Sequence, residues 1–140
     1  MDAKTSLQTQ VEAWAQAIIS QDIEIIMSHY ADNVRAFDAI GPLEFTGRDS
    51  YKAHWQKCMS SCSLTAFEIS AVETEVNDDL AACSFLNRCG GKDENGEEKA
   101  CWMRATQVYK NQDGRWLIIH EHFSLPFDMN SFEIQFDLTP

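Results

Sequence analysis

The chain has 140 residues and a formal net charge of −11, because 22 acidic residues outnumber 11 lysines and arginines. A nucleic-acid-binding surface needs clustered cations to neutralise phosphates, so this charge balance argues against nucleic acid as a partner. No apolar run approaches the roughly 20 residues of a transmembrane helix, so no membrane contact is expected, and the length suits one domain over residues 1–140.

The N-terminal part of the chain is predicted to contain two helices. Five apolar residues recur at helical spacing and make one stripe on the first helix: Leu7, Val11, Trp14, Ala15 and Ile18. Asp22 can cap a short second helix, on which Ile26 and Tyr30 share a face. Asp32 and Asn33 favour a turn, so this second helix is expected to end before them.

A short irregular stretch separates these helices from a third one. Residues 34–37 have an extended pattern, and after the break at Gly41-Pro42 residues 43–45 are expected to pair back as a short strand. A third helix follows Thr46-Gly47 and carries four side chains on one side, namely Tyr51, Trp55, Cys58 and Cys62. All the predicted helices therefore precede the main strand region.

From Leu64 onward the pattern changes to the alternation that is typical of strands. Three turn signals, at residues 77–79, 95–96 and 111–114, divide four long strands, which predicts an antiparallel meander. Helices followed by such a sheet indicate an α+β, cone-like fold with three N-terminal helices packed on a curved antiparallel sheet. The tail at residues 131–138 alternates again and is expected to be either an edge strand or a segment docked on a partner.

The last strand, residues 116–124, carries three titratable side chains in an otherwise apolar segment. A side-chain period of two puts Trp116, Ile118, His120 and His122 on one face, and Leu117, Ile119, Glu121 and Phe123 on the other. A buried imidazole or carboxylate needs a hydrogen-bond partner or a wet cavity. A pocket beside this strand is therefore expected.

The five cysteines are odd in number, and no secretory leader opens the chain, so a reducing cytoplasm is the expected location. Cys58 and Cys62 lie four residues apart on one predicted helical face, so a redox pair is one interpretation of these two cysteines. They lack the C-x-x-C spacing of a dithiol motif, so core thiols are the favoured interpretation.

Four segments carry a family resemblance: Tyr30-Ala31-Asp32-Asn33-Val34, Phe45-Thr46-Gly47-Arg48, Asp113-Gly114-Arg115-Trp116 and His120-Glu121-His122-Phe123-Ser124. With the order of elements, they resemble the nuclear transport factor 2-like superfamily, in its SnoaL-like, ketosteroid isomerase-related branch. The resemblance implies a cone-shaped pocket between the helices and the concave sheet, and a homodimer packed through the other sheet face. Enzymes, transport factors and oligomerisation domains share this scaffold, so the fold alone leaves the chemistry open.

Two groups of proteins in this superfamily suggest roles for individual positions. Asp38 resembles the Asp base of ketosteroid isomerase, although it could also be a polar residue that closes the turn at residues 39–42. Trp14 stands where that enzyme has its oxyanion-hole Tyr, and the second oxyanion-hole residue falls near Thr106. Steroid isomerisation is therefore not expected.

The association domain of calcium/calmodulin-dependent protein kinase II gives the second comparison. Arg88 and Arg104 resemble two of its pocket arginines, and a third falls at Phe123. These arginines could form a buried ion pair with Glu121 or clamp a ligand carboxylate. If Phe123 faces the pocket, Glu121 faces it too, and the histidines of the last strand turn to the convex face.

The residues together predict that the domain binds a small organic ligand, with a carboxylate or carbonyl group, in an apolar pocket. Candidate catalytic residues are Asp38, as a proton-transfer base, Glu121 and His122. Candidate ligand-binding residues are Trp14, Phe37, Trp55, Arg88, Trp102, Arg104, His120 and Phe123. No cofactor or metal is expected, although the alternating His120 and His122 leave a metal site open. A cofactor-free isomerase or lyase, a binder without turnover and an oligomerisation module all remain open.

Overall fold

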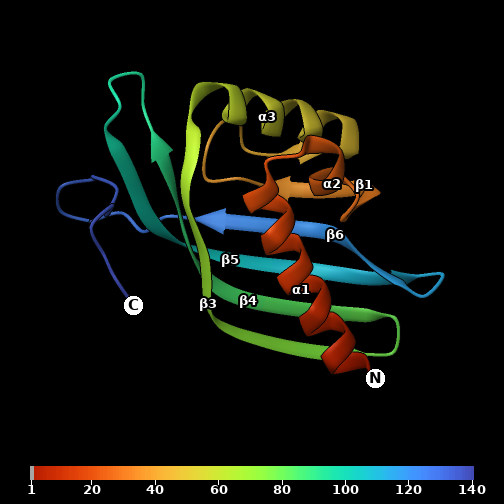
Figure 1. Cartoon of the computed structure of the whole chain (residues 1–140). Coiled ribbons are helices and arrows are strands. Elements are labelled where there is room, and N and C mark those ends of the chain that lie inside the picture. The colour runs from red at the N-terminus through yellow and green to blue at the C-terminus, as the bar shows by residue number, and fades with distance from the viewer. Residues whose placement is uncertain (1) are drawn as a thin grey trace.

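The computed structural model of the protein describes residues 2–140, which contain three helices and six strands (Figure 1). The helices are α1 (Ala3–Ser20), α2 (Ile23–Met27) and α3 (Arg48–Ser61). The strands are β1 (Tyr30–Phe37), β2 (Phe45–Thr46), β3 (Ser63–Asn77), β4 (Leu80–Lys92), β5 (Glu98–Gln112) and β6 (Arg115–Ser124). Helices followed by a meander confirm the predicted α+β class.

The first two helices begin at acidic caps and bury the predicted apolar stripe. All five stripe residues of α1 are buried, and Asp2 accepts a 2.8 Å hydrogen bond from the backbone N–H of Thr5. Asp22 caps α2, as predicted, by accepting hydrogen bonds from the backbone N–H groups of Glu24 and Ile25. Within residues 2–140, no helix is long and apolar enough to cross a membrane.

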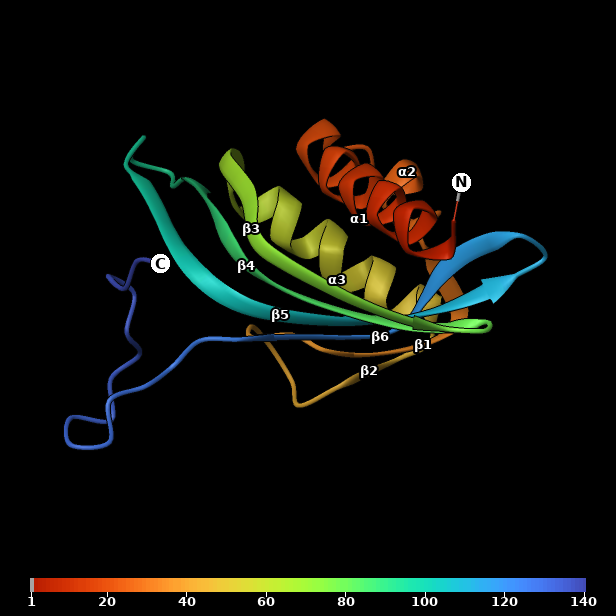
Figure 2. The same cartoon turned by 90° about the horizontal axis from the view of Figure 1, so that it is seen from below.

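The strands form one curved sheet in the order β2-β1-β6-β5-β4-β3, with the three helices on one side of it (Figure 2). Strands β3 to β6 are the predicted antiparallel meander. Strand β1, however, pairs in parallel with β6, so the sheet is mixed rather than wholly antiparallel. A parallel pair needs a long crossover, and here α3 and strands β3 to β5 lie between the two strands in the chain.

A β-bulge in β6 changes which of its side chains share a face. Ile118 pairs with Tyr109 but His120 pairs with Val108, so Ile119 is an extra residue on the β6 side. The prediction of one regular period along residues 116–124 is therefore wrong. The buried side chains on the helix side are Trp116, Ile118, Glu121 and Phe123. The conditional prediction that Glu121 and Phe123 face inward together is confirmed.

The hydrophobic core fills the space between the helices and the concave face of the sheet. The fully buried Trp14 lies at its centre, with its ring centroid 5.6 to 6.2 Å from the rings of Phe67, Phe85 and Phe123. These contacts place Trp14 and Phe123, both candidate ligand residues, in the packed core.

The C-terminal tail after β6 forms no strand with the sheet. Its described residues make a single bridge, between Phe127 and Ile134, and the rings of Phe127 and Phe132 stack at 5.9 Å. The edge-strand alternative for residues 131–138 is therefore wrong. Six large apolar side chains of the tail are more than two fifths exposed, namely Phe127, Met129, Phe132, Ile134, Phe136 and Leu138.

Candidate functional site

A cavity of about 860 Å³ lies between α3, the turn at residues 39–42, strands β4 and β5, and the tail. Its wall is mostly apolar or sulfur-containing and includes Phe45, Trp55, Met59, Cys89, Cys101 and Met103. The tail contributes Leu125, Ile134 and Phe136. Apart from His54, Lys57 is the one ionisable nitrogen among the described lining residues. Such a cavity favours an apolar ligand with few polar groups.

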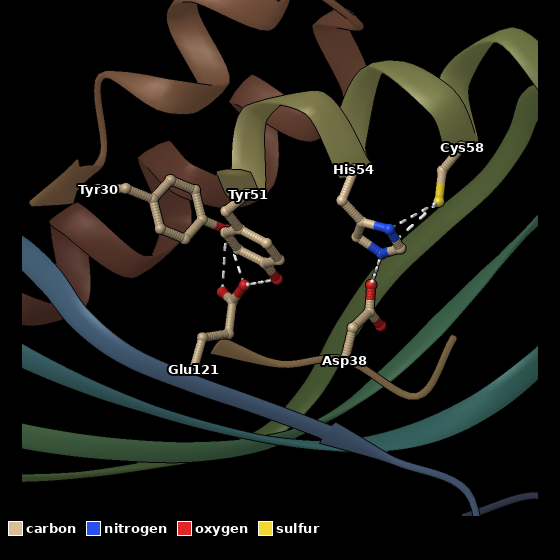
Figure 3. Close-up of polar contacts among 6 residues, drawn as sticks. All are labelled: Tyr30, Asp38, Tyr51, His54, Cys58 and Glu121. Carbon is tan, nitrogen blue, oxygen red and sulfur yellow. Dashed lines mark hydrogen bonds and ion pairs between the residues drawn. The ribbon is translucent and has the colours of Figure 1, made fainter. Parts of the chain in front are cut away.

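The main polar feature of the cavity wall is His54, which pairs with Asp38 at the border of a neighbouring hollow. Asp38 follows the end of β1, and its Oδ2 accepts a hydrogen bond from Nε2 of His54, which comes from α3 (Figure 3). The ring of Phe45 stacks on His54 with 4.3 Å between centroids. The side chains of His54 and Asp38 are 8% and 17% exposed, so little water reaches the pair.

Gly41 lets the chain turn beneath this pair. Its φ of +94° is in the region that favours glycine, and a Cβ there would lie 3.5 Å from Cε1 of His54. Residues Ala39, Gly41 and Pro42 line the cavity on one side and a second hollow, which Asp38 borders, on the other. The turn therefore holds the carboxylate at the boundary between the two spaces.

Cys58 lies one helical turn after His54 and completes a row of three reactive side chains. Its Sγ is 3.7 Å from Nε2 and 4.0 Å from Nδ1 of His54 (Figure 3). Burial, and then the negative charge of Asp38, raise the pKa of the Cys58 thiol. The thiol is therefore neutral at rest.

Glu121 is fully buried and accepts hydrogen bonds from three side chains (Figure 3). Tyr30 donates at 2.9 to 3.0 Å, Tyr51 at 2.5 Å and Gln107 at 2.7 Å. Burial raises the pKa of Glu121 to about 7, against the opposing effect of these hydrogen bonds. Glu121 does not line the cavity.

A second layer of hydrogen bonds orients the partners of Glu121. Trp14 donates from Nε1 to the Tyr30 hydroxyl at 2.9 Å, and the Tyr109 hydroxyl donates to the side-chain carbonyl of Gln107 at 2.7 Å. The ring of Tyr51 stacks near His54 with 6.1 Å between centroids. Tyr51 therefore connects the buried Glu121 network to the Asp38–His54 pair.

The two candidate arginines lie on the convex face of the sheet, not in the cavity. Residues alternate along β4 and β5, so the inward positions belong to side chains such as Asn87 and Gln107, and Arg88 and Arg104 point outward. Arg88 lies 3.9 Å from Glu98, and Arg104 donates to the Ser124 hydroxyl at 3.1 Å. The alternative of an ion pair between one of these arginines and Glu121 is therefore wrong.

Other candidate residues share this outward face. Trp102 pairs with Arg88 across β4 and β5, and the ring of Phe37 meets His120 and His122 edge-on, with centroids 4.9 and 5.4 Å apart. Nδ1 of His120 is 2.7 Å from the carbonyl of Arg35. Among residues 2–140, no group of three His, Cys, Asp or Glu side chains is arranged to hold a metal ion.

Of the predicted site residues, Trp55 therefore lines the cavity, Phe37, Asp38 and His122 line the second hollow, and Glu121 is buried. Sequence reasoning missed His54 and Cys58 as a reactive pair. Their spacing of four on the face that carries Tyr51 was the available signal, because such residues are neighbours on a helix.

Comparison with known proteins identifies the fold and its family. The family model described as the SnoaL-like domain matches residues 7–128. The chain is similar to the crystal structure of an NTF2-like protein of unknown function from Pseudomonas putida KT2440, with 41% identity over 100% of this chain and 99% of that one, and a TM-score of 0.88.

More distant structures share the fold alone. A candidate calcium/calmodulin-dependent protein kinase II association domain from Xanthomonas campestris is 20% identical, covers 84% of each chain and has a TM-score of 0.75. A ketosteroid isomerase-like protein from Erwinia carotovora atroseptica is 15% identical, covers 86% of this chain and 93% of that one, and has a TM-score of 0.73. No curated protein matches the chain.

Proposed function

Because this chain belongs to the SnoaL-like domain family, on an NTF2-like fold, we propose that its cavity binds a small, uncharged organic molecule bearing a carbonyl group. The observation that supports this most strongly is His54, which lines a largely apolar cavity of about 860 Å³ and pairs with the half-buried Asp38 behind it. Apolar pockets with a few convergent polar groups are the usual form of small-molecule sites.

A carbonyl group fits the cavity better than a carboxylate. A buried carboxylate needs a cation beside it, but Arg88 and Arg104 point away from the cavity, and Lys57, the one lysine in its wall, is exposed to solvent. Trp55 lines the cavity, although its indole N–H is enclosed by protein and does not face a ligand there.

The chemistry we propose is proton transfer without a cofactor, of the kind used in isomerase or lyase reactions. A carbonyl makes the adjacent carbon acidic, and the Asp38–His54 pair can accept its proton and return it to another position. The ring of Phe45, stacked on His54 with 4.3 Å between centroids, packs against the imidazole and orients it.

The ligand class can be tested by thermal shift with two matched compounds, 4-phenyl-2-butanone and 3-phenylpropanoate. The first carries a ketone where the second carries a carboxylate. We expect the ketone at 100 times its dissociation constant to add about 2.7 kcal/mol of stability, and the carboxylate to add little. Cys101→Trp, which fills the cavity, should abolish the shift, whereas Arg104→Ala, on the convex face, should leave it intact. A larger shift with the carboxylate would contradict the proposal.

Assembly is a second candidate function, and the exposed apolar tail favours it. We propose a homodimer that packs through the convex face, which carries Phe37, Trp102 and His120. Light scattering that gives the mass of a monomer at micromolar concentration would refute the dimer. All five cysteines are free thiols, which fits the proposed cytoplasmic location.

A further inference from the structure

We propose that Cys58 adds covalently to α,β-unsaturated carbonyl compounds held in the cavity, with His54 as the base. This inference rests on the proposed carbonyl-binding function and names a narrower ligand class for the same site. It adds a nucleophile to a site whose proton-transfer chemistry uses Asp38 and His54 alone.

The geometry supplies a nucleophile, a base and a group that orients the base. His54 and Cys58 are four residues apart on α3 and both line the cavity. Nε2 of His54 is bonded to Asp38, which leaves Nδ1, 4.0 Å from the Cys58 sulfur, to accept a proton. A nucleophile beside a base that a third group orients is the arrangement that activates thiols.

The resting state of Cys58 explains why a base is needed. Burial and the Asp38 charge raise the pKa of the thiol, so the neutral thiol is the main species at neutral pH. His54 can take the proton as the sulfur attacks, and Asp38 stabilises the imidazolium that forms. The thiol therefore reacts when an electrophile lies beside it in the cavity.

The addition consumes no oxidant, reductant or cofactor. The sulfur forms a bond to the β-carbon of the enone, the carbon–carbon π electrons move toward the carbonyl, and the thiol proton passes to His54. The enolate oxygen carries the displaced negative charge until His54 returns the proton to the α-carbon. The product is a saturated thioether, and the reverse sequence releases the enone.

Cys58 differs from the other thiols of the cavity wall, which are Cys62, Cys89 and Cys101. Among the described cysteines, Cys58 is the one whose sulfur hydrogen-bonds an imidazole. Burial raises the pKa of Cys89 to about 11. Cys62 is exposed, so its reaction with an enone measures the rate expected without a base.

The test uses 4-phenyl-3-buten-2-one, whose saturated counterpart is 4-phenyl-2-butanone, with peptide mapping by mass spectrometry to follow each cysteine over time. We expect Cys58 to react at least about tenfold faster than Cys62, with a rate that saturates as the enone fills the cavity. His54→Gln should lower the Cys58 rate at least about tenfold and leave the Cys62 rate unchanged. Asp38→Asn is a second variant if circular dichroism shows that His54→Gln is unfolded.

The possible failures can be told apart. If the saturated ketone binds but Cys58 reacts no faster than Cys62, or reacts equally fast in both folded variants, the covalent role is refuted and the binding function stands. If the saturated ketone does not bind, the proposed function fails and this inference fails with it.

Discussion

Replacing Glu121 by glutamine tests the buried network through its pH dependence. Glu121 is completely buried, its hydrogen-bond donors are all neutral, and burial raises its pKa from the ordinary 4.5 to about 7. Glutamine has nearly the same size and does not ionise. The change therefore removes one titration and leaves the cavity and the sheet in place.

The direction and size of the pH effect on unfolding free energy follow from the pKa of Glu121 in the unfolded and folded chains. Below pH 4.5 the carboxyl group is protonated in both the folded and the unfolded chain, so the full stability is present. Between pH 4.5 and about 7 the unfolded chain releases the proton while the folded chain keeps it, so the free energy of unfolding falls as pH rises. A shift of this size corresponds to about 3 kcal/mol, and above about pH 7 the loss is complete.

Urea unfolding followed by tryptophan fluorescence can measure this loss in the wild type and in Glu121→Gln between about pH 4.5 and 7.5. We expect the difference in unfolding free energy between the two proteins to change by about 3 kcal/mol across this range, in the direction that favours the variant at the higher pH. Other titrating groups are common to both proteins and cancel. A difference that stays constant with pH would show that Glu121 titrates alike in the folded and unfolded chains.

Three further substitutions give separate expectations. Tyr51→Phe removes the 2.5 Å donor to Glu121, so we expect chemical unfolding to show a loss of about 1–3 kcal/mol and the pH-dependent fall in stability to extend to higher pH. Gly41→Ala puts a methyl group near His54 on a backbone whose φ of +94° favours glycine, so thermal unfolding should show about 1 kcal/mol of destabilisation. Unchanged stability would refute the assigned turn. Trp102→Glu puts a charge on the convex face, so light scattering should show dissociation of the proposed dimer, and an unchanged mass would place the interface elsewhere.

The helices and the meander could be predicted because their signals are local. The stripe through Leu7 and Trp14 specifies α1, and turn residues such as Asn77 and Gly114 end strands where the chain must reverse. Each signal depends on neighbours within a few positions. The predicted order of elements therefore agrees with the structure.

The orientation of the site residues depended on contacts that periodicity does not record. The bulge at Ile119 shifts the face of every residue after it, and nothing in the composition of residues 116–124 indicates one extra residue. Arg88 and Arg104 were assigned by resemblance to a pocket, whereas the strand alternation turns them outward.

The pair of Asp38 and His54 was also beyond local reasoning. The two residues are 16 positions apart, and the turn at Gly41 and the packing of Phe45 on His54 bring them together. Asp38 could be chosen from the sequence as a candidate, but its partner could not.

The most direct test of the proposed chemistry is hydrogen–deuterium exchange at the carbons beside the carbonyl of 4-phenyl-2-butanone, followed by proton NMR in deuterated buffer. We predict that the protein accelerates this exchange with saturation by ketone, and that Asp38→Asn lowers the acceleration on the order of 100-fold while the ketone still binds. Exchange no faster than in buffer, or equal exchange by the wild type and the folded Asp38→Asn protein, would contradict the assignment of Asp38 and His54 as the proton-transfer pair.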